Sequence, residues 1–452
     1  MASIIAIKYF HFANIIPSSI FAKRAPVSAP TRTASQKPMI TREEQLRKSV
    51  LSGIAIVATL YGVAGARAET PGVTKDEIRI GNTVPYSGPV SSKGATGRVI
   101  EEYFAMINEK GGVNGRKLKL FSLDDAFSPP KTVEAVRRLV EGEEVAFMFG
   151  MFGTAQNVAT AKYLNAKKVP QLFLVSSSVQ WDDPKGKPWS LALPWAPPLY
   201  AEAGIDVAYA RKKNPDARFA ILYQNDDAGR EYLKGVRDAL GPDADRLLAS
   251  AQSFNVTDPT IDSQIAILAN TKADVFLIYS LTSRACVQAL SKANNLGWKP
   301  LRFLASSCAN TQEVMEPAGL DVATGVLALG SVKPWDPDPK NDPAMAEYNR
   351  FMKERLPNVD PSNLTSTYAY MISQALVDVL ARCKDDLSRE NIMAVATSMK
   401  DVSLPMMLPG IKLNTSRDDY RPVKDGYMFE FNGKGWTIGT ELYHDILPTR
   451  TN

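Results

Sequence analysis

Short apolar runs alternate along the chain with longer segments in which apolar residues recur every three or four positions. The first case lies between residues 77 and 124: the run IRIGNTV, a loop of small residues, an amphipathic stretch from about Gly94 to Lys110, and the run KLKLFSL. The amphipathic stretch has glutamates on one helical face and apolar side chains on the other. These apolar residues are Val99, Tyr103, Phe104 and Ile107. A strand, a helix and a second strand in direct succession predict a parallel β-α-β unit.

The same alternation continues through most of the sequence. Further strands are predicted at 145–150, 169–176, 218–225, 246–254, 273–280 and 301–307. Further helices are predicted at about 129–143, 154–168, 200–213, 229–240, 260–272, 284–297, 343–355 and 368–383. The segment GYMFEFNGKGWTIG at 426–439 is typical of a hairpin. The predicted fold class is therefore α/β, with parallel sheets flanked by helices.

Three segments interrupt this alternation, at 182–200, 325–343 and 403–414, and each contains prolines. We interpret them as three crossings between two lobes, neither of which is contiguous in sequence. The first lobe then comprises 73–193 and 331–406. The second comprises 197–328 and 413–445. Two lobes joined by three crossings predict a hinge with a cleft.

The composition is that of a globular protein, and 452 residues exceed the usual size of one domain. The net charge of +5 does not indicate a nucleic-acid-binding protein, because nine of the 53 basic residues but only two of the 48 acidic ones lie in the first 68 residues. The rest of the chain has 44 basic and 46 acidic residues. A basic surface for nucleic acid is therefore not expected.

Residues 1–68 resemble an N-terminal extension followed by a signal peptide. Arg42, Arg47 and Lys48 precede the apolar run VLSGIAIVATLYGVAGA, and Ala66 and Ala68 offer small residues at the cleavage spacing. We expect cleavage near Ala68; a membrane-anchoring helix is the alternative. A start at Met39 instead of Met1 would give a signal peptide of ordinary length.

Cysteine and histidine usage restricts the chemistry. The three cysteines, Cys286, Cys308 and Cys383, allow one disulfide, and the sequence does not choose the pair. His444 is the only histidine after residue 68, and no metal-ligand spacing occurs. A histidine-based catalytic triad is therefore not expected. We predict neither a cofactor nor a metal.

Loops after the predicted strands are the expected place for a ligand, because open α/β sheets bind ligands beyond the carboxyl ends of their strands. These loops are YSGPVSSKG, GMFGTAQN, VSSSVQW, QNDDAGRE, YSLTSRA and ASSCAN. They are rich in serine and threonine. Asp226 and Asp227 could form a catalytic carboxylate pair, but a turn and helix cap is the favoured interpretation.

Several motifs occur in an order that resembles one family. They are SGP, INEKGGVNGRKL, DDAFSPPKTVEAVRRLV, KKVPQLF, LYQNDDAGREYLKG, TDPTIDSQI and LPGIKLNTS. From Val73 onward the chain resembles the periplasmic solute-binding proteins of branched-chain amino acid type ABC transporters, and most closely the branch associated with aromatic acids. This resemblance implies a two-lobe type I periplasmic binding protein fold, export to the periplasm, an inner-membrane permease as partner, and a monomer without enzymatic activity.

The resemblance also implies a binding site. In the family a Ser or Thr binds the ligand carboxylate, and the matching residue here is Thr154, which could equally be a helix cap. A loop of small residues follows the next strand in the family, and Ser177 and Ser178 match it here. Amino-acid-binding relatives place an acid for the ligand ammonium where this chain has Ser307, so an ammonium would lack its partner. The predicted site consists of Ser87, Lys93, Phe152, Thr154, Ala155, Ser176, Ser177, Ser178, Ala228, Thr282 and Ser307.

Besides Ser307, two of these residues depart from what is usual in the family. Lys93 stands where an aromatic residue is common, and either pairs with a ligand carboxylate or is solvated. Ala228 also replaces an aromatic residue, which opens space in the second lobe. Phe152, like Trp181, either lines an apolar pocket or simply packs.

The resemblance and these departures favour a protein that closes on a small organic carboxylate with an aromatic body. Binding of a branched-chain amino acid or an amide by the same mechanism is the nearest alternative. A sensory receptor domain would need a membrane span after the domain, and none follows Trp436. An enzyme is disfavoured because nucleophile-elbow and dinucleotide-binding motifs are absent.

Overall fold

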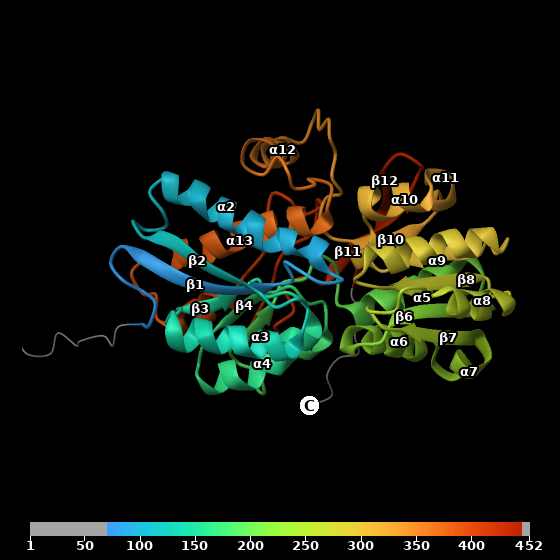
Figure 1. Ribbon diagram of the computed structural model, residues 1–452, viewed down its shortest axis with the longest axis horizontal. Coiled ribbons are helices and arrows are strands. Elements are labelled where there is room, and N and C mark those ends of the chain that lie inside the picture. Colours follow the sequence, from blue (N-terminus) through green and yellow to red (C-terminus); the bar gives the residue numbers. More distant parts are fainter. Residues whose placement is uncertain (1–69, 445–452) are drawn as a thin grey trace, which may run out of the picture. The chain divides into compact units, whose positions relative to one another are not determined.

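The described chain contains two β-sheets, and the first is entirely parallel. The computed structural model describes residues 70–444, and Figure 1 shows their arrangement. The strands are ordered β2-β1-β3-β4-β5 and are all parallel. Their bounds are β1 Glu77–Val84, β2 Lys117–Asp124, β3 Phe147–Phe149, β4 Gln171–Leu174 and β5 Ser190–Ala192. Helices α2 and α13 cover one face of this sheet, and α3 and α4 cover the other (Figure 1).

The helices associated with the first sheet come from two distant parts of the chain. Their bounds are α2 Ala95–Glu109, α3 Pro129–Arg137, α4 Thr154–Ala166, α12 Pro343–Arg355, α13 Leu364–Cys383 and α14 Arg389–Ala396. Strand side chains alternate between the two helical layers, as the strand period of two requires. Phe147 and Phe149 of β3 join the core that contains α2 and α13, whereas Met148 joins the core that contains α3 and α4.

The second sheet is larger and mixed. Its order is β12-β11-β10-β9-β8-β6-β7. The strands are β6 Phe219–Gln224, β7 Leu248–Phe254, β8 Val275–Tyr279, β9 Leu301–Leu304, β10 Leu327–Gly330, β11 Asp425–Phe431 and β12 Trp436–His444. Strands β6 to β10 are parallel, and β11 and β12 are antiparallel. The predicted α/β class with mainly parallel sheets is confirmed, and the predicted hairpin forms the antiparallel edge, where β11 pairs with β10.

Helices cover both faces of the second sheet as well. Their bounds are α5 Leu199–Lys213, α6 Asp227–Leu240, α7 Ala244–Leu247, α8 Asp262–Asn270, α9 Ser283–Asn295, α10 Glu316–Ala318 and α11 Leu320–Ala323. Leu277 and Tyr279 of β8 join the core that contains α5 and α6. Phe276 and Ile278 join the core that contains α8 and α9. Because helices cover both faces of the sheet, the side chains on both faces of β8 are buried, and its sequence is therefore a continuous apolar run.

The chain passes between the two sheets three times. It runs from β5 to α5, from β10 to helices α12–α14, and back to β11. Two of the predicted crossings also contain short strands, β5 and β10, which proline-rich surroundings concealed. Helix α14 was not predicted, and α13 begins at Leu364 instead of Tyr368, because Asn363 caps it by accepting a hydrogen bond from Thr365 N at 3.0 Å.

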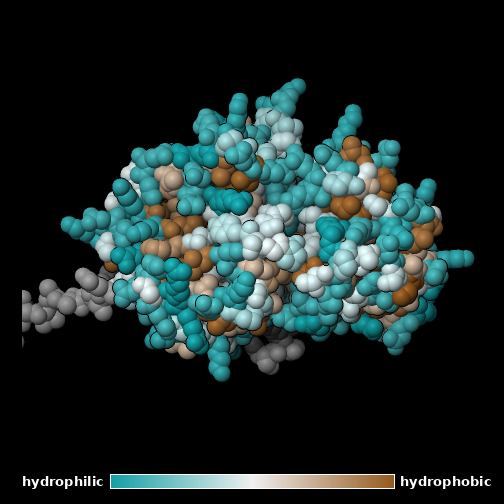
Figure 2. Space-filling model, viewed as in Figure 1, coloured by the Kyte–Doolittle hydropathy of each residue, from teal (hydrophilic) through white to brown (hydrophobic). Residues whose placement is uncertain are grey.

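On the face shown in Figure 2, hydrophilic side chains predominate and apolar ones are scattered in small groups. Within residues 70–444 no helix combines the length and the apolar character that crossing a membrane requires. In the same range no cluster of three or more His, Cys, Asp or Glu could hold a metal ion. The predicted signal peptide with cleavage near Ala68 lies outside the described residues.

The disulfide joins Cys286 to Cys308, with 6.2 Å between their Cα atoms, and Cys383 is a buried free thiol. Cys286 lies on α9, and Cys308 ends the short 3-10 helix η5 (Ser306–Cys308). The bridge therefore ties the loop after β9 to the helix after β8. Both elements stand at the carboxyl edge of the second sheet.

We expect the Cys286→Ser/Cys308→Ser double variant to lose about 3 kcal/mol of unfolding free energy, because the bridge closes a loop with a sequence separation of 22. Urea unfolding with and without dithiothreitol measures this. The wild-type protein and a Cys383→Ala control should both become less stable in the reductant, whereas the double variant should not respond. A response of the double variant would contradict the assignment.

Candidate functional site

A cavity lies where the carboxyl edges of the two sheets meet. The first sheet contributes Phe152, Gly153, Thr154, Val175, Ser176 and Ser177, and the second contributes Leu199, Tyr279, Leu281, Ser306 and Ser307. Trp195, from the first crossing, completes the lining. The space that the centre of a water-sized sphere can reach is about 20 Å³. That is room for about one water molecule, so the two walls are nearly closed on each other.

The first wall is built around the start of α4. Gly153 precedes the helix with φ 99°, and a Cβ there would lie 2.2 Å from Gln156 Oε1, so the turn requires glycine. No side chain caps α4. Asn157 N donates to Gly153 O, which leaves the N–H groups of Thr154, Ala155 and Gln156 without an intrahelical acceptor. A helix start of this kind attracts an anion or another acceptor.

A chain of hydroxyl groups extends from this helix start. Trp181 Nε1 donates to Ser176 Oγ at 2.7 Å, and Ser176 Oγ lies 2.8 Å from Thr154 Oγ1. The indole can only donate, so Ser176 accepts from it. One hydroxyl hydrogen then joins Ser176 and Thr154, and the other is available to the cavity. The Ser177 hydroxyl, also in the lining, has no hydrogen-bond partner among residues 70–444. The first wall therefore offers hydrogen-bond donors to the cavity.

The second wall has the opposite character. Ser306 donates to Glu202 through its N–H at 2.6 Å and its hydroxyl at 2.9 Å, while Trp195 Nε1 donates to Ser306 Oγ at 2.9 Å. Ser307 Oγ donates to Ser280 O at 2.8 Å. These serine hydrogens are therefore already used within the protein. Most of the remaining surface of this wall is apolar, supplied by Trp195, Leu199 and Leu281.

None of the cavity-lining residues carries a charge. Glu202 accepts hydrogen bonds from the cavity-lining residue Ser306. Its side chain is completely buried, and burial raises its pKa. Asp206, one helical turn further along α5, has its pKa raised by burial and by Glu202. Tyr232 donates to Asp206 Oδ2 at 2.7 Å. These acids belong to the framework behind the second wall.

Comparison with known proteins gives this architecture a family. The sequence profile of a family described as "Periplasmic binding protein" matches residues 77–435. The chain belongs to the periplasmic binding protein family. This is a family of non-enzymatic binding proteins, so its functional site is expected to be a binding cleft between two α/β lobes.

Individual relatives are distant. The "Leu/Ile/Val-binding protein homolog 7" of Brucella suis is 27% identical over 280 residues, which cover 60% of this chain and 67% of that protein. A branched-chain amino acid ABC transporter structure from Thermus thermophilus with bound valine has a TM-score of 0.73 at 14% identity, covering 83% of this chain and 98% of that one. A fatty acid ABC transporter substrate-binding protein from Thermomonospora curvata has a TM-score of 0.69 at 18% identity, covering 84% and 95%. These structures share the fold.

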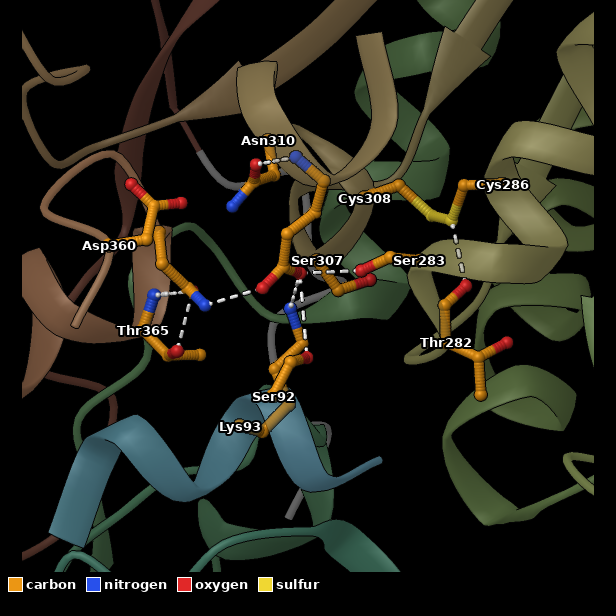
Figure 3. A network of polar contacts seen from close by, with 12 residues as sticks. Ser92, Lys93, Thr282, Ser283, Cys286, Ser307, Cys308, Asn310, Asp360 and Thr365 are labelled. Carbon is orange, nitrogen blue, oxygen red and sulfur yellow. Dashed lines mark hydrogen bonds and ion pairs between the residues drawn. A yellow bond between two sulfur atoms is a disulfide. The ribbon is translucent and has the colours of Figure 1, made fainter. Parts of the chain in front are cut away.

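Two sets of contacts join the walls of this binding protein outside the cavity. In the first, Lys93 of the first body lies 3.5 Å from Glu313 Oε2, on the π-helical turn η6 (Thr311–Met315) of the second body. Ser283 donates to Glu313 Oε2 at 2.6 Å and Asn363 donates to Oε1 at 2.8 Å. Figure 3 shows how these groups converge from separate elements. Lys93 is only 3% exposed, so it is not solvated. It is also not among the residues that line the cavity.

In the second set, Glu231 of α6 reaches the loop after β4. Its carboxyl accepts from the Ser178 hydroxyl and, at 2.7 Å, from Val179 N. Burial raises the pKa of Glu231 to about 7, although these hydrogen bonds act in the opposite direction. This contact is therefore sensitive to pH in the physiological range.

The structure gathers part of the predicted site in the cavity. Phe152, Thr154, Ser176, Ser177 and Ser307 line it, and Ala155 follows Thr154 on the helix. The other predicted residues lie outside the lining: Ser87, bonded to Asp124; Lys93; Ser178; Ala228, buried on α6; and Thr282, bonded to Ser280. The predicted cap is confirmed at Asp226, which accepts from Gly229 N at 2.8 Å.

Sequence reasoning did not single out several lining residues. Tyr279 ends β8 and Leu281 follows it, both within the predicted segment YSLTSRA, and Ser306 lies in the predicted segment ASSCAN after β9. Each could have been found by extending the strand-end rule to apolar and aromatic residues. Trp195 and Leu199 offered no such signal, because they lie in the segment interpreted as a crossing.

A double-mutant cycle tests the Lys93–Glu313 contact. We expect a coupling of about 2 kcal/mol between Lys93→Met and Glu313→Gln in urea unfolding, because the side chains are only 4% and 20% exposed. The control pair Lys167–Glu141 is 56% exposed on both sides and should couple by less than about 1 kcal/mol. Equal coupling in the two cycles would show that Lys93 and Glu313 do not meet in solution.

Glu231→Gln should remove part of the pH dependence of stability. The wild-type carboxyl contributes stability that is fully present below its ordinary pKa of 4.5 and is lost as the pH rises through about 7. This shift corresponds to about 3 kcal/mol. Urea unfolding from pH 4.5 to 8 should show the wild-type protein losing stability relative to the glutamine variant by that amount. The half-exposed Glu141→Gln serves as control; an unchanged slope in Glu231→Gln would contradict the prediction.

Proposed function

We propose that this protein is the extracytoplasmic substrate-binding component of an ABC transporter and binds a small organic carboxylate with an aromatic body and no ammonium group. Its two lobes, residues 73–193 with 331–406 and residues 197–328 with 413–445, close on the ligand. The closed form then delivers the ligand to an inner-membrane permease. It acts as a monomer in the periplasm, and it uses no cofactor.

The observation that carries the proposal is the polarity of the cavity. The uncapped start of α4 and the hydroxyl groups of Thr154 and Ser177 supply hydrogen-bond donors on one side. The opposite side is largely apolar and aromatic, with Trp195 and Leu281 among its residues. A carboxylate held by helix N–H groups with an aromatic body against the second wall satisfies both sides.

The small volume of the cavity supports the closure mechanism. Small-molecule sites usually measure about 300 Å³ or more, whereas a water-sized sphere finds only about 20 Å³ here. A ligand can therefore enter only after the walls separate. The Lys93–Glu313 and Glu231–Ser178 contacts cross between the walls, so they would break on opening and form again on closing.

A branched-chain amino acid is the second candidate, and the name of the Brucella relative favours it. Such a ligand brings an ammonium group that must find an acceptor in a buried place. The position expected to provide an acid holds Ser307, whose hydroxyl already donates to Ser280 O. Glu202 is separated from the cavity by Ser306. The amino acid therefore fits this cavity less well than a carboxylate without an ammonium group.

Thermal unfolding in the presence of candidate ligands tests the proposal. A ligand at about 100 times its Kd adds about 2.7 kcal/mol of stability, which raises the Tm by a few degrees. We expect this shift with aromatic carboxylates and not with leucine, isoleucine or valine. A shift with leucine alone would replace the proposed ligand by the second candidate.

Thr154→Val should weaken carboxylate binding about tenfold, because a hydroxyl donor to a charged group is lost while the volume stays similar. Thr154→Ser, which keeps the hydroxyl, should bind within about threefold of the wild-type protein. Isothermal titration measures both. Equal affinities of the valine variant and the wild-type protein would contradict the assigned role of Thr154.

A further inference from the structure

Tyr279 is the last residue of β8, a central strand of the second sheet that pairs with β6 and β9. Its side chain is 1% exposed and lines the cavity on the wall opposite Thr154. Its ring packs beside that of Tyr232, with 5.9 Å between centroids and 30° between planes. The strand and this ring contact hold Tyr279 in place.

The phenol of Tyr279 lacks a hydrogen-bond partner. Within residues 70–444 its hydroxyl makes no hydrogen bond. Three of the four other fully buried tyrosines in this range are satisfied, and Tyr370 is the exception. Tyr232 donates to Asp206, Tyr348 donates to Pro361 O at 2.7 Å, and Tyr368 donates to Leu193 O. The oxygen of this hydroxyl is not among the fully enclosed polar atoms that lack a partner, which is consistent with its facing the cavity that Tyr279 lines. Since Tyr279 lines the cavity, a cavity occupant can supply the missing partner.

The surroundings determine which partner is suitable. Burial and the nearby acids Asp226, Glu231 and Glu202 raise the pKa of Tyr279, so its hydroxyl keeps its proton at neutral pH. A neutral phenol donates one hydrogen bond and accepts others. Its natural partner is a neutral oxygen, such as a hydroxyl or carbonyl group of the ligand. The same acids would also tolerate a ligand ammonium, which is the competing occupant.

We infer that Tyr279 is a specificity-determining residue that binds a second, uncharged oxygen group on the ligand, at the end remote from the carboxylate. This inference rests on the proposed function and deepens it. The ligand class becomes an aromatic acid that carries a hydroxyl or carbonyl group, in place of a purely hydrocarbon aromatic acid.

Paired ligands that differ only in this oxygen test the inference. Isothermal titration compares para-hydroxybenzoate with benzoate, and para-hydroxyphenylpropanoate with phenylpropanoate, on the wild-type protein, Tyr279→Phe and Tyr232→Phe. We expect the wild-type protein to prefer the hydroxylated acid at least tenfold in one pair. Tyr279→Phe should abolish this preference and change binding of the unsubstituted acid less than about twofold. Tyr232→Phe should keep the preference.

Unfolding without ligand gives a second readout. Tyr279→Phe should leave the Tm of the ligand-free protein unchanged or raised, because no hydrogen bond is lost. Tyr232→Phe should lower the Tm, because Asp206 loses its donor. The two tyrosines are both fully buried neighbours, so this comparison isolates the presence of a partner within the protein.

The outcomes separate the two proposals. Equal weakening of both members of a pair by Tyr279→Phe, or a fall in Tm as large as that of Tyr232→Phe, would overturn the role of Tyr279 alone. Binding of leucine and of no carboxylate by the wild-type protein would overturn the proposed function and this inference together.

Discussion

The direction of the strands constrains where this protein can bind a ligand. In parallel sheets every connection starts at the same edge, so helix N-termini and their short loops collect there. Both sheets of this chain have such an edge, and the two edges face each other across the cavity. The uncapped start of α4, the serine loop after β4 and the end of β8 all lie there. They meet because of topology, although they are distant in sequence.

The two walls differ because their polar groups are satisfied in different ways. Two tryptophans each donate to a serine, Trp181 to Ser176 and Trp195 to Ser306. On the first wall the serine is followed by Thr154, which leaves a hydroxyl hydrogen for a ligand. On the second wall it is followed by the carboxyl of Glu202, which takes the hydrogen. The carboxyl of Glu202 thus occupies the serine hydroxyl hydrogen on the second wall, whereas a hydroxyl hydrogen of the Ser176–Thr154 pair stays available on the first.

Contacts outside the cavity hold the closed arrangement without touching a ligand. Glu313 gathers donors from Ser283 and Asn363 in addition to Lys93. Ser283 lies in the same proposed lobe as Glu313, whereas Lys93 and Asn363 belong to the other. Closing therefore adds an ion pair and a hydrogen bond to a carboxylate that Ser283 already contacts. The Cys286–Cys308 bridge fixes the loop behind the second wall. Binding energy from a ligand can then be used to bring together two preformed surfaces.

The hydrophobic pattern by itself determined the α/β class, most helix and strand positions and the final hairpin, because strand and helix periods depend on local sequence. The strand-end rule also placed Thr154, Ser176, Ser177 and Ser307 at the edge that lines the cavity. The cysteine pairing and the partner of Lys93 were decided only by the tertiary structure. Glu202 appears in sequence as an ordinary helical acid, and only packing against Ser306 buries it. Trp195 and Tyr279 depend likewise on how distant segments pack, and local periodicity carries no information about such contacts.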